Sequence, residues 1–190
     1  LEHDRDNFVS ELHRLVGRPI GVNLEPVDLE AEMLEDRLDI PKGRQLNLDT
    51  VKRLEEVGFD FVCLTGNPGT GVTNEQIEKA IRLTKEHFSG LVIAGKMHGA
   101  GSDEPVADLT IAKQFIEAGA DVILVPAVGT VPGFDMEELK AVVREVHRCG
   151  GLVLSAIGTS QESSDEDTIK EIAIMNKICG VDIQHFGDAG

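Results

Sequence analysis

The sequence predicts a parallel (β/α)8 barrel, the TIM-barrel fold, of which this chain carries six of the eight strand–helix units. Short apolar segments bounded by glycine alternate with segments of helical length, which is typical of parallel strands buried on both faces. The junctions between helices and strands also recur at a fixed spacing, which indicates an internal repeat. Finally, polar residues and glycines gather where the predicted strands end, as they do at the mouth of such a barrel.

One helix-to-strand junction occurs three times along the chain. Gly58, Gly119 and Gly180 each end a predicted helix, and each is followed by an apolar residue, an aspartate and a strand. Successive glycines of this set are 61 residues apart, so the repeat contains two βα units. A closed barrel favours such equivalence because every strand occupies an equivalent position, whereas an open doubly wound sheet, the main alternative, does not require it. The aspartates lie at the starts of their strands, so we expect them to stabilise the N-terminal face of the barrel rather than to take part in chemistry.

The individual elements follow from apolar runs and their flanking residues. The predicted strands cover residues 19–25, 59–65, 91–97, 121–127, 152–158 and 181–186. The predicted helices cover residues 4–16, 47–57, 73–87, 107–118, 135–148 and 165–178. Thr73 and Asp135 are the predicted N-caps of two helices, and Gln76 would complete a capping box with Thr73.

A closed barrel of this type has eight strands, and the sequence provides six. We therefore expect residues 1–190 to form one incomplete barrel domain, with two strands before Leu1 and a last helix after Gly190. The open edges of such a sheet would allow a homo-oligomer. The long segment 26–46, between the first two strands, is a candidate lid over the active site, and a surface excursion without a functional role is the alternative.

Composition and charge exclude several classes of function. The chain has 34 acidic and 18 basic residues and a net charge of −16, so its surface repels phosphate backbones and nucleic acid is not an expected partner. No segment approaches the roughly 20 apolar residues of a membrane helix, and no apolar signal segment follows the charged first residues. The three cysteines lie far apart in sequence, which fits a reduced chain. We expect a cytoplasmic protein without a membrane partner.

Four residues at the predicted strand ends are candidates for catalysis. Glu25 ends the first strand on the same side as Asn23 and could act as an acid or base, or form a salt bridge with a nearby cation. Lys96 and His98 lie two residues apart on one side of an extended segment. Lys96 could hold an anion or act as an electrophilic amine, or pair with Glu25. His98, unless it only makes a loop hydrogen bond, and His185 are candidate proton shuttles near neutral pH.

Residues expected to bind the substrate follow the first, second, fifth and sixth strands. The fifth and sixth strands would be the seventh and eighth of a whole barrel, whose loops often bind phosphate through backbone N–H groups. Residues 65–73 resemble a phosphate loop but lack the lysine of GxxxxGK[ST], so no nucleotide site is predicted; there is also no flavin or zinc motif, and a magnesium site stays open. The predicted substrate-binding residues are Asn23, Thr65, Asn67, Gly158, Thr159, Ser160, Gly187, Asp188 and Gly190.

Five segments carry more specific motifs. They are GRPIGVNLEP at 17–26, LTGNPGTGV at 64–72, AGKMHGAG at 94–101, AIGTSQ at 156–161 and HFGDAG at 185–190. Together they resemble an uncharacterised bacterial TIM-barrel family whose members are sometimes labelled phosphoenolpyruvate phosphonomutase-like. The resemblance spans essentially the whole chain and implies a full barrel with two strands upstream, but no established reaction. The acidic magnesium motif and the lysine–cysteine–glycine–histidine loop of the phosphonomutase and isocitrate lyase superfamily do not occur in the sequence.

These observations predict a lyase or isomerase that acts on a small phosphorylated or carboxylated metabolite at the C-terminal face of the barrel. In this interpretation the substrate is a small anion, and the strand-end residues bind it and transfer protons. The alternative is a non-catalytic barrel that binds a ligand or another protein for regulation or assembly. That alternative predicts strand-end polar groups that pair only with one another.

Overall fold

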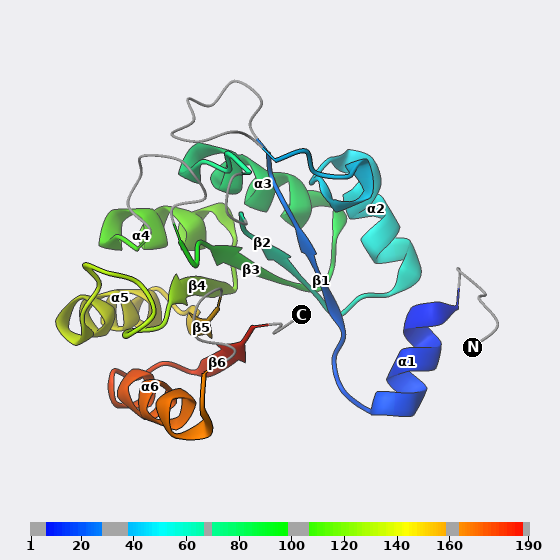
Figure 1. Cartoon of the computed structure of the whole chain (residues 1–190). Coiled ribbons are helices and arrows are strands. Elements are labelled where there is room, and N and C mark those ends of the chain that lie inside the picture. The colour runs from blue at the N-terminus through cyan, green and yellow to red at the C-terminus, as the bar shows by residue number, and fades with distance from the viewer. Residues whose placement is uncertain (1–6, 28–37, 67–69, 99–106, 159–163, 188–190) are drawn as a thin grey trace.

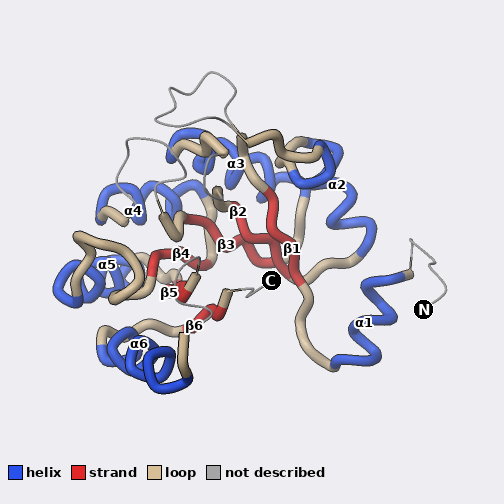
Figure 2. The backbone as a smooth tube through the Cα atoms, viewed as in Figure 1, coloured by secondary structure: helices blue, strands red, loops and turns tan. Residues whose placement is uncertain are grey.

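The computed structural model describes residues 7–27, 38–66, 70–98, 107–158 and 164–187. Six parallel strands form one sheet in the order β1-β2-β3-β4-β5-β6, so each strand lies beside its neighbours in sequence. The sheet curls into a half-barrel, and helices lie along its outer side (Figure 1; Figure 2). The predicted barrel fold is confirmed for these six units.

The observed elements match the predicted ones closely. The strands are β1 (Gly21–Leu24), β2 (Phe61–Leu64), β3 (Leu91–Gly95), β4 (Val122–Pro126), β5 (Leu152–Ile157) and β6 (Ile183–Phe186). The helices are α1 (Phe8–Val16), α2 (Leu48–Val57), α3 (Asn74–His87), α4 (Leu109–Ala118), α5 (Met136–Arg148) and α6 (Glu166–Ile178). The strands are one or two residues shorter than predicted: β3 and β5 only at their ends, β6 only at its start, and the other three at both.

Helix N-caps fix where several helices begin. Thr73 caps α3 by accepting a hydrogen bond from the backbone N–H of Gln76 at 3.2 Å, and Asp135 caps α5, as predicted. Among the described helices, the complete capping box is found at Asp135 of α5 and at Asn47 of α2. The predicted box at Thr73 is therefore realised only in its first half, the bond from the N3 backbone to the cap.

Side chains alternate between two apolar layers, one on each face of the sheet. The outer layer packs against the helices and contains Val62, Leu64, Val92, Ala94, Ile123, Val125 and Val153. The inner layer lies in the concave side of the half-barrel and contains Ile93, Val122, Leu124, Leu154 and Ala156, with Phe61, Cys63 and Met97 packed against them. This alternation explains why the strands are apolar throughout rather than on one face only.

The three repeated aspartates have one structural role at the N-terminal ends of the strands. Each carboxylate accepts one hydrogen bond from a backbone N–H of the preceding strand segment and one from a basic side chain of the preceding odd-numbered helix. For Asp60, Asp121 and Asp182 the backbone donors are Ile20, Val92 and Val153, at 2.6, 2.8 and 2.8 Å. The basic partners are His13, Lys85 and His147, at 2.6, 3.2 and 2.8 Å. The 61-residue repeat thus corresponds to a pair of strands tied together by one carboxylate.

Part of the long segment after β1 is described. Residues 28–37 of the proposed lid lie outside the described residues. Before α2 the chain forms a short 3-10 helix (Lys42–Arg44), and Gln45 then forms an isolated parallel bridge with Glu25. Within the described ranges, no helix combines the length and apolar character needed to cross a membrane.

Candidate functional site

The concave face of the half-barrel contains a cavity of about 880 Å³. All six strands, or the residues directly after them, contribute to its lining. The wall is mainly apolar and includes Phe61, Ile93, Leu124 and Leu154. A volume of this size is within the range of small-molecule sites, which are commonly apolar with a few convergent polar groups.

Five residues predicted from strand ends lie together in this cavity. They are Asn23 of β1, Thr65 after β2, Gly158 after β5, His185 of β6 and Gly187 after β6. The sheet brings them together because parallel strands direct all their C-terminal ends to one side. His185 is exposed to the cavity side of an edge strand, where its register partner on β5 is Ala156.

Two polar atoms of the cavity wall are buried without a hydrogen-bond partner among the described residues. Asn23 Oδ1 and Thr65 Oγ1 make no hydrogen bond with the described residues. Thr65 is only 1% exposed, and its backbone N–H donates to Leu24 O at 3.4 Å. Asn23 is in register with Cys63, two residues before Thr65, so both side chains lie on the same face of neighbouring strands. Buried oxygens of this kind are uncommon in folded proteins and need a physical explanation.

Glu25 is completely buried directly after β1. Its carboxylate accepts a hydrogen bond from Arg44 Nη2 at 2.6 Å, and the Arg44 side chain is 51% exposed. A backbone hydrogen bond joins the same two residues, because Glu25 N–H donates to Arg44 O at 2.8 Å. Glu25 does not contribute to the cavity surface; its carboxylate instead anchors the end of the long segment to β1.

Lys96 is buried directly after β3, with 1% of its surface exposed. The residue before it, Gly95, has a φ of 152°, and a Cβ built there would lie 1.9 Å from the carbonyl oxygen of Leu124. Only glycine fits this close approach between β3 and β4. After this turn Met97 lines the cavity, whereas Lys96 and His98 do not. The roles predicted for Lys96 and His98 stay predictions.

The loops after β5 and β6 are described only in part. Gly158 and Gly187 line the cavity, and Gly187 N–H already donates to Ile157 O at 2.7 Å, which extends the strand ladder. Gly187 can therefore leave room for a ligand but does not offer its N–H. The other predicted residues of these loops and of the loop after β2 lie outside the described residues: Asn67, Thr159, Ser160, Asp188 and Gly190.

Sequence reasoning missed four residues of the site. Arg44 is far from Glu25 in sequence, and nothing in its surroundings predicts the contact. Cys63 and Met97 have apolar neighbours and resemble core residues; desolvation raises the pKa of the Cys63 thiol to about 12. Gln184 joins the last two strands, because its Nε2 donates to Ser155 O at 2.7 Å and its Oε1 accepts from the Ser155 hydroxyl at 3.0 Å.

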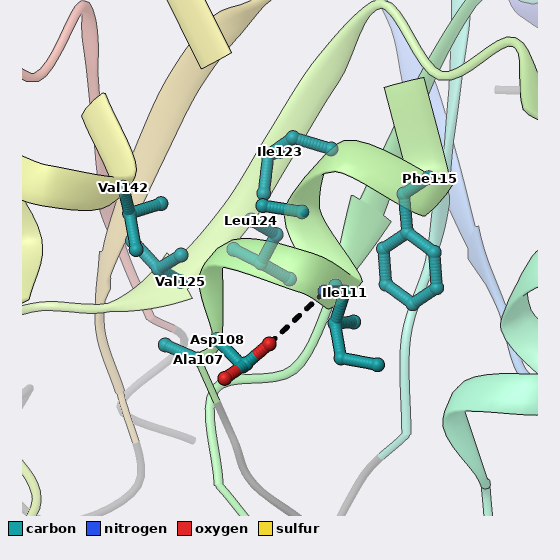
Figure 3. A pocket seen from close by; sticks show the side chains of 10 residues that line it. Ala107, Asp108, Ile111, Phe115, Ile123, Leu124, Val125 and Val142 are labelled. Atoms are coloured by element: carbon teal, nitrogen blue, oxygen red, sulfur yellow. Dashed lines mark hydrogen bonds between the residues drawn. The ribbon is translucent and has the colours of Figure 1, made fainter. Parts of the chain in front are cut away.

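A second, much smaller space lies between α4 and the sheet. Figure 3 shows its lining of apolar side chains, with Asp108 capping α4 through Ile111 N–H at 3.2 Å. Its volume is about 10 Å³, which is room for no more than one water molecule. This space is a packing gap and not a ligand site.

The described residues contain no group of three or more His, Cys, Asp or Glu side chains placed to hold a metal ion. The three junction aspartates pair with basic groups at the end of the barrel opposite the strand C-terminal ends. We assign no metal ligands.

The chain matches a protein family described as a domain of unknown function, DUF7916, over residues 1–190. No curated protein matches it. Among solved structures it is similar to a putative lyase/mutase from Burkholderia cenocepacia, with a TM-score of 0.58 and 18% identity over 94% of this chain and 58% of that one. A putative phosphonomutase from the same organism gives a TM-score of 0.55 and 11% identity, over 88% of this chain and 68% of that one.

A GMP reductase from Trypanosoma brucei, solved in complex with guanosine 5'-triphosphate, gives a TM-score of 0.54 and 18% identity over 78% of this chain. This chain spans only 33% of the length of that reductase. At these identities the likenesses show the barrel fold alone.

Proposed function

The chain belongs to the DUF7916 family, and we propose that it supplies most of the active site of an enzyme, a lyase or isomerase acting on a small phosphorylated or carboxylated metabolite. One observation carries the proposal: residues from the C-terminal ends of four strands (Asn23, Thr65, Gly158, His185 and Gly187) share one cavity of about 880 Å³, which runs along the concave face of the sheet. Barrel enzymes perform their chemistry at this end, where strand-end residues surround the substrate.

The proposed roles follow from where each residue lies. His185 lines the cavity and is the proposed proton shuttle, since imidazole exchanges protons near neutral pH. Glu25 and Lys96 are buried just beyond the strands, and we propose them as acid or base and as anion-binding group, respectively. His98 is a second proposed shuttle. The loops that begin at Gly158 and Gly187 are the proposed phosphate or carboxylate site.

Local charge supports an anionic substrate despite the acidic chain. The net charge is −16, so an anion needs a positive region to overcome the average field. Lys96 lies beside the end of β3, and Arg44, whose side chain is half-exposed, lies beside the end of β1, where one of its N–H groups is already engaged by Glu25. An arginine so placed can bind a carboxylate or phosphate through two N–H groups.

One observation favours a second candidate, a barrel that binds a ligand without catalysis. Glu25 is engaged by Arg44, which is the pairing that a non-catalytic barrel predicts at its strand ends. The two candidates differ in turnover, because both bind a ligand in the same cavity but only the enzyme changes it chemically.

The test uses the complete protein and a panel of phosphorylated and carboxylated metabolites. A metabolite that binds the native state raises the melting temperature, and NMR of the bound metabolite over time reports turnover. We expect at least one metabolite to be converted, and His185→Gln to reduce the rate about 100-fold or more, as for a general acid or base.

His147→Gln is the matched control. His147 bonds Asp182 at the opposite end of the barrel, so its replacement should leave turnover unchanged. Binding without conversion would support the non-catalytic barrel. Equal loss of turnover in both variants would show that His185 acts through stability and would refute its proposed role.

A further inference from the structure

We propose that Asn23 and Thr65 form a subsite for a hydroxyl group of the ligand, so that the substrate is a small hydroxylated phosphate or carboxylate. This proposal rests on the proposed function and narrows its substrate class. It starts from two facts: both side chains line the cavity, and each has a buried oxygen without a partner among the described residues.

The two orphan oxygens are on neighbouring strands and on one face. Asn23 pairs with Cys63 across the β1–β2 ladder, and Thr65 is two residues further along the same side. Thr65 is 1% exposed, so bulk water does not reach its hydroxyl freely. A group that enters the cavity between these two side chains can contact both.

The chemistry of the two atoms selects the group. An amide oxygen only accepts hydrogen bonds, whereas a threonine hydroxyl both donates and accepts. A ligand hydroxyl satisfies both at once, since it donates to Asn23 Oδ1 and accepts from Thr65 Oγ1–H. A carboxylate or phosphate oxygen cannot donate to Asn23 Oδ1, so the charged end of the ligand belongs elsewhere in the cavity.

The apolar wall indicates the chemistry of the remaining part of the ligand. Phe61, Ile93 and Leu124 line the space beside the subsite, and their carbon surfaces suit the short carbon chain between a hydroxyl and an anionic group. A ligand with its anionic group beside β5 and β6 and its hydroxyl beside β1 and β2 would span the cavity. The subsite therefore orients the ligand as well as selecting it.

Thr84 provides the internal comparison. Its Oγ1 is also buried without a partner among the described residues, and its side chain is fully buried. However, Thr84 lies in α3 and does not line the cavity. The buried hydroxyl of Thr84 therefore lies away from the cavity, whereas Thr65 contributes to the lining of a cavity in which a ligand can bind.

The binding test compares probes that differ by hydroxyl groups. Isothermal titration of the complete protein with glycerol 3-phosphate and with propyl phosphate, and with glycerate and propanoate, gives the affinity ratio for each pair. Sites that hydrogen-bond a substrate hydroxyl strongly reject the analogue that lacks it. We expect the hydroxylated probe to bind about 10-fold or more tightly in at least one pair, and Thr65→Val to reduce that ratio to about 1. Thr84→Val should leave it unchanged.

A stability measurement keeps the test decisive without a bound probe. Without ligand, Thr65→Val and Thr84→Val should both raise the midpoint of urea unfolding, because each removes an unsatisfied buried hydroxyl. A lowered midpoint for Thr65→Val alone would show that its hydroxyl has a structural partner in the complete protein, which overturns the subsite.

The outcomes separate this inference from the proposed function. Equal affinities within both pairs, or a ratio that survives Thr65→Val, overturn the hydroxyl subsite while anion binding stands. If none of the four probes binds, the result counts against the anionic substrate class of the proposed function, and the unfolding midpoints decide the subsite.

Discussion

Asn176 of α6 offers the sharpest test of how the fold positions the site. Its side chain is fully buried and bonds the first residue of the turn after β4. Asn176 Oδ1 accepts from Val128 N–H at 3.0 Å, and Asn176 Nδ2 donates to Ile172 O at 2.7 Å and to Val128 O at 3.4 Å. Ile172 and Asn176 are the two residues of α6 that are buried, so this amide is a main attachment of the helix that leads into β6.

The Asn176→Leu variant keeps a side chain of similar shape and removes all three hydrogen bonds of the amide. Val128 is 8% exposed, so its N–H loses its partner where water does not replace it well. An unsatisfied buried donor costs about 1–3 kcal/mol, and the lost bonds to the two carbonyls add to this. We expect the free energy of unfolding to fall by about 2–4 kcal/mol, a large part of the roughly 5–15 kcal/mol of a typical domain.

Equilibrium unfolding in urea measures this change, and Lys177→Ala is the control. Lys177 is the exposed neighbour of Asn176 on the same helix, and a surface replacement there should change stability by no more than about 0.5 kcal/mol. If Asn176→Leu is equally mild, the amide does not hold α6 to the sheet and the reasoning is wrong.

Three further predictions concern single residues. Gly95→Ala should destabilise the protein by at least about 2 kcal/mol in urea unfolding, since a methyl there lies 1.9 Å from a backbone oxygen of β4; a neutral effect would contradict this contact. A backbone N–H first, and His13 second, lower the pKa of Asp60 below 3.8, so its stabilisation is complete above that pH and lost as pH falls through the folded value. Between about pH 5 and about pH 3, the midpoint of urea unfolding should therefore fall less for Asp60→Asn than for the wild type. Parallel plots of midpoint against pH for the two proteins would refute this link between protonation of Asp60 and stability. Iodoacetamide at about pH 8 should label Cys149 before Cys63, whose pKa is about 12, as read by mass spectrometry; equal labelling in the native state would contradict the desolvated thiol.

Much of the fold follows from the sequence because buried parallel strands leave a strong pattern. Each must be apolar on both faces, and each junction repeats because the strands are equivalent positions of a barrel. Asp60, for example, occurs in a motif whose carboxylate ties two neighbouring strands, and the same geometry requires an aspartate again at 121 and 182. Local rules therefore agree with the tertiary structure at these positions.

The site was predictable in part. Asn23, Thr65 and His185 were found because strand C-terminal ends converge, whatever the loops do. Alternation continues beyond β3, because Met97 shares the parity of Leu91 and Ile93 and lines the cavity with them. It fails beyond β1, where Glu25 shares the parity of Asn23 but does not contribute to the cavity surface.

Two contacts left no signal in the sequence. The ion pair of Glu25 with Arg44 and the amide contact of Asn176 with Val128 join residues that are distant along the chain. Such pairs depend on how loops and helices pack, and neither helical nor strand periodicity records them.

Hydrogen–deuterium exchange of the complete protein, with and without a metabolite found by the thermal screen, tests the central claim most directly. The cavity at the strand ends predicts slower exchange on binding in peptides that contain residues 21–25, 61–66 and 183–187. Peptides from the helix ends of the junctions, around His13 and His147, do not line the cavity and should exchange at the same rate in both states. Protection confined to those junctions, or to the outer helices, would place the ligand away from the cavity and contradict the account.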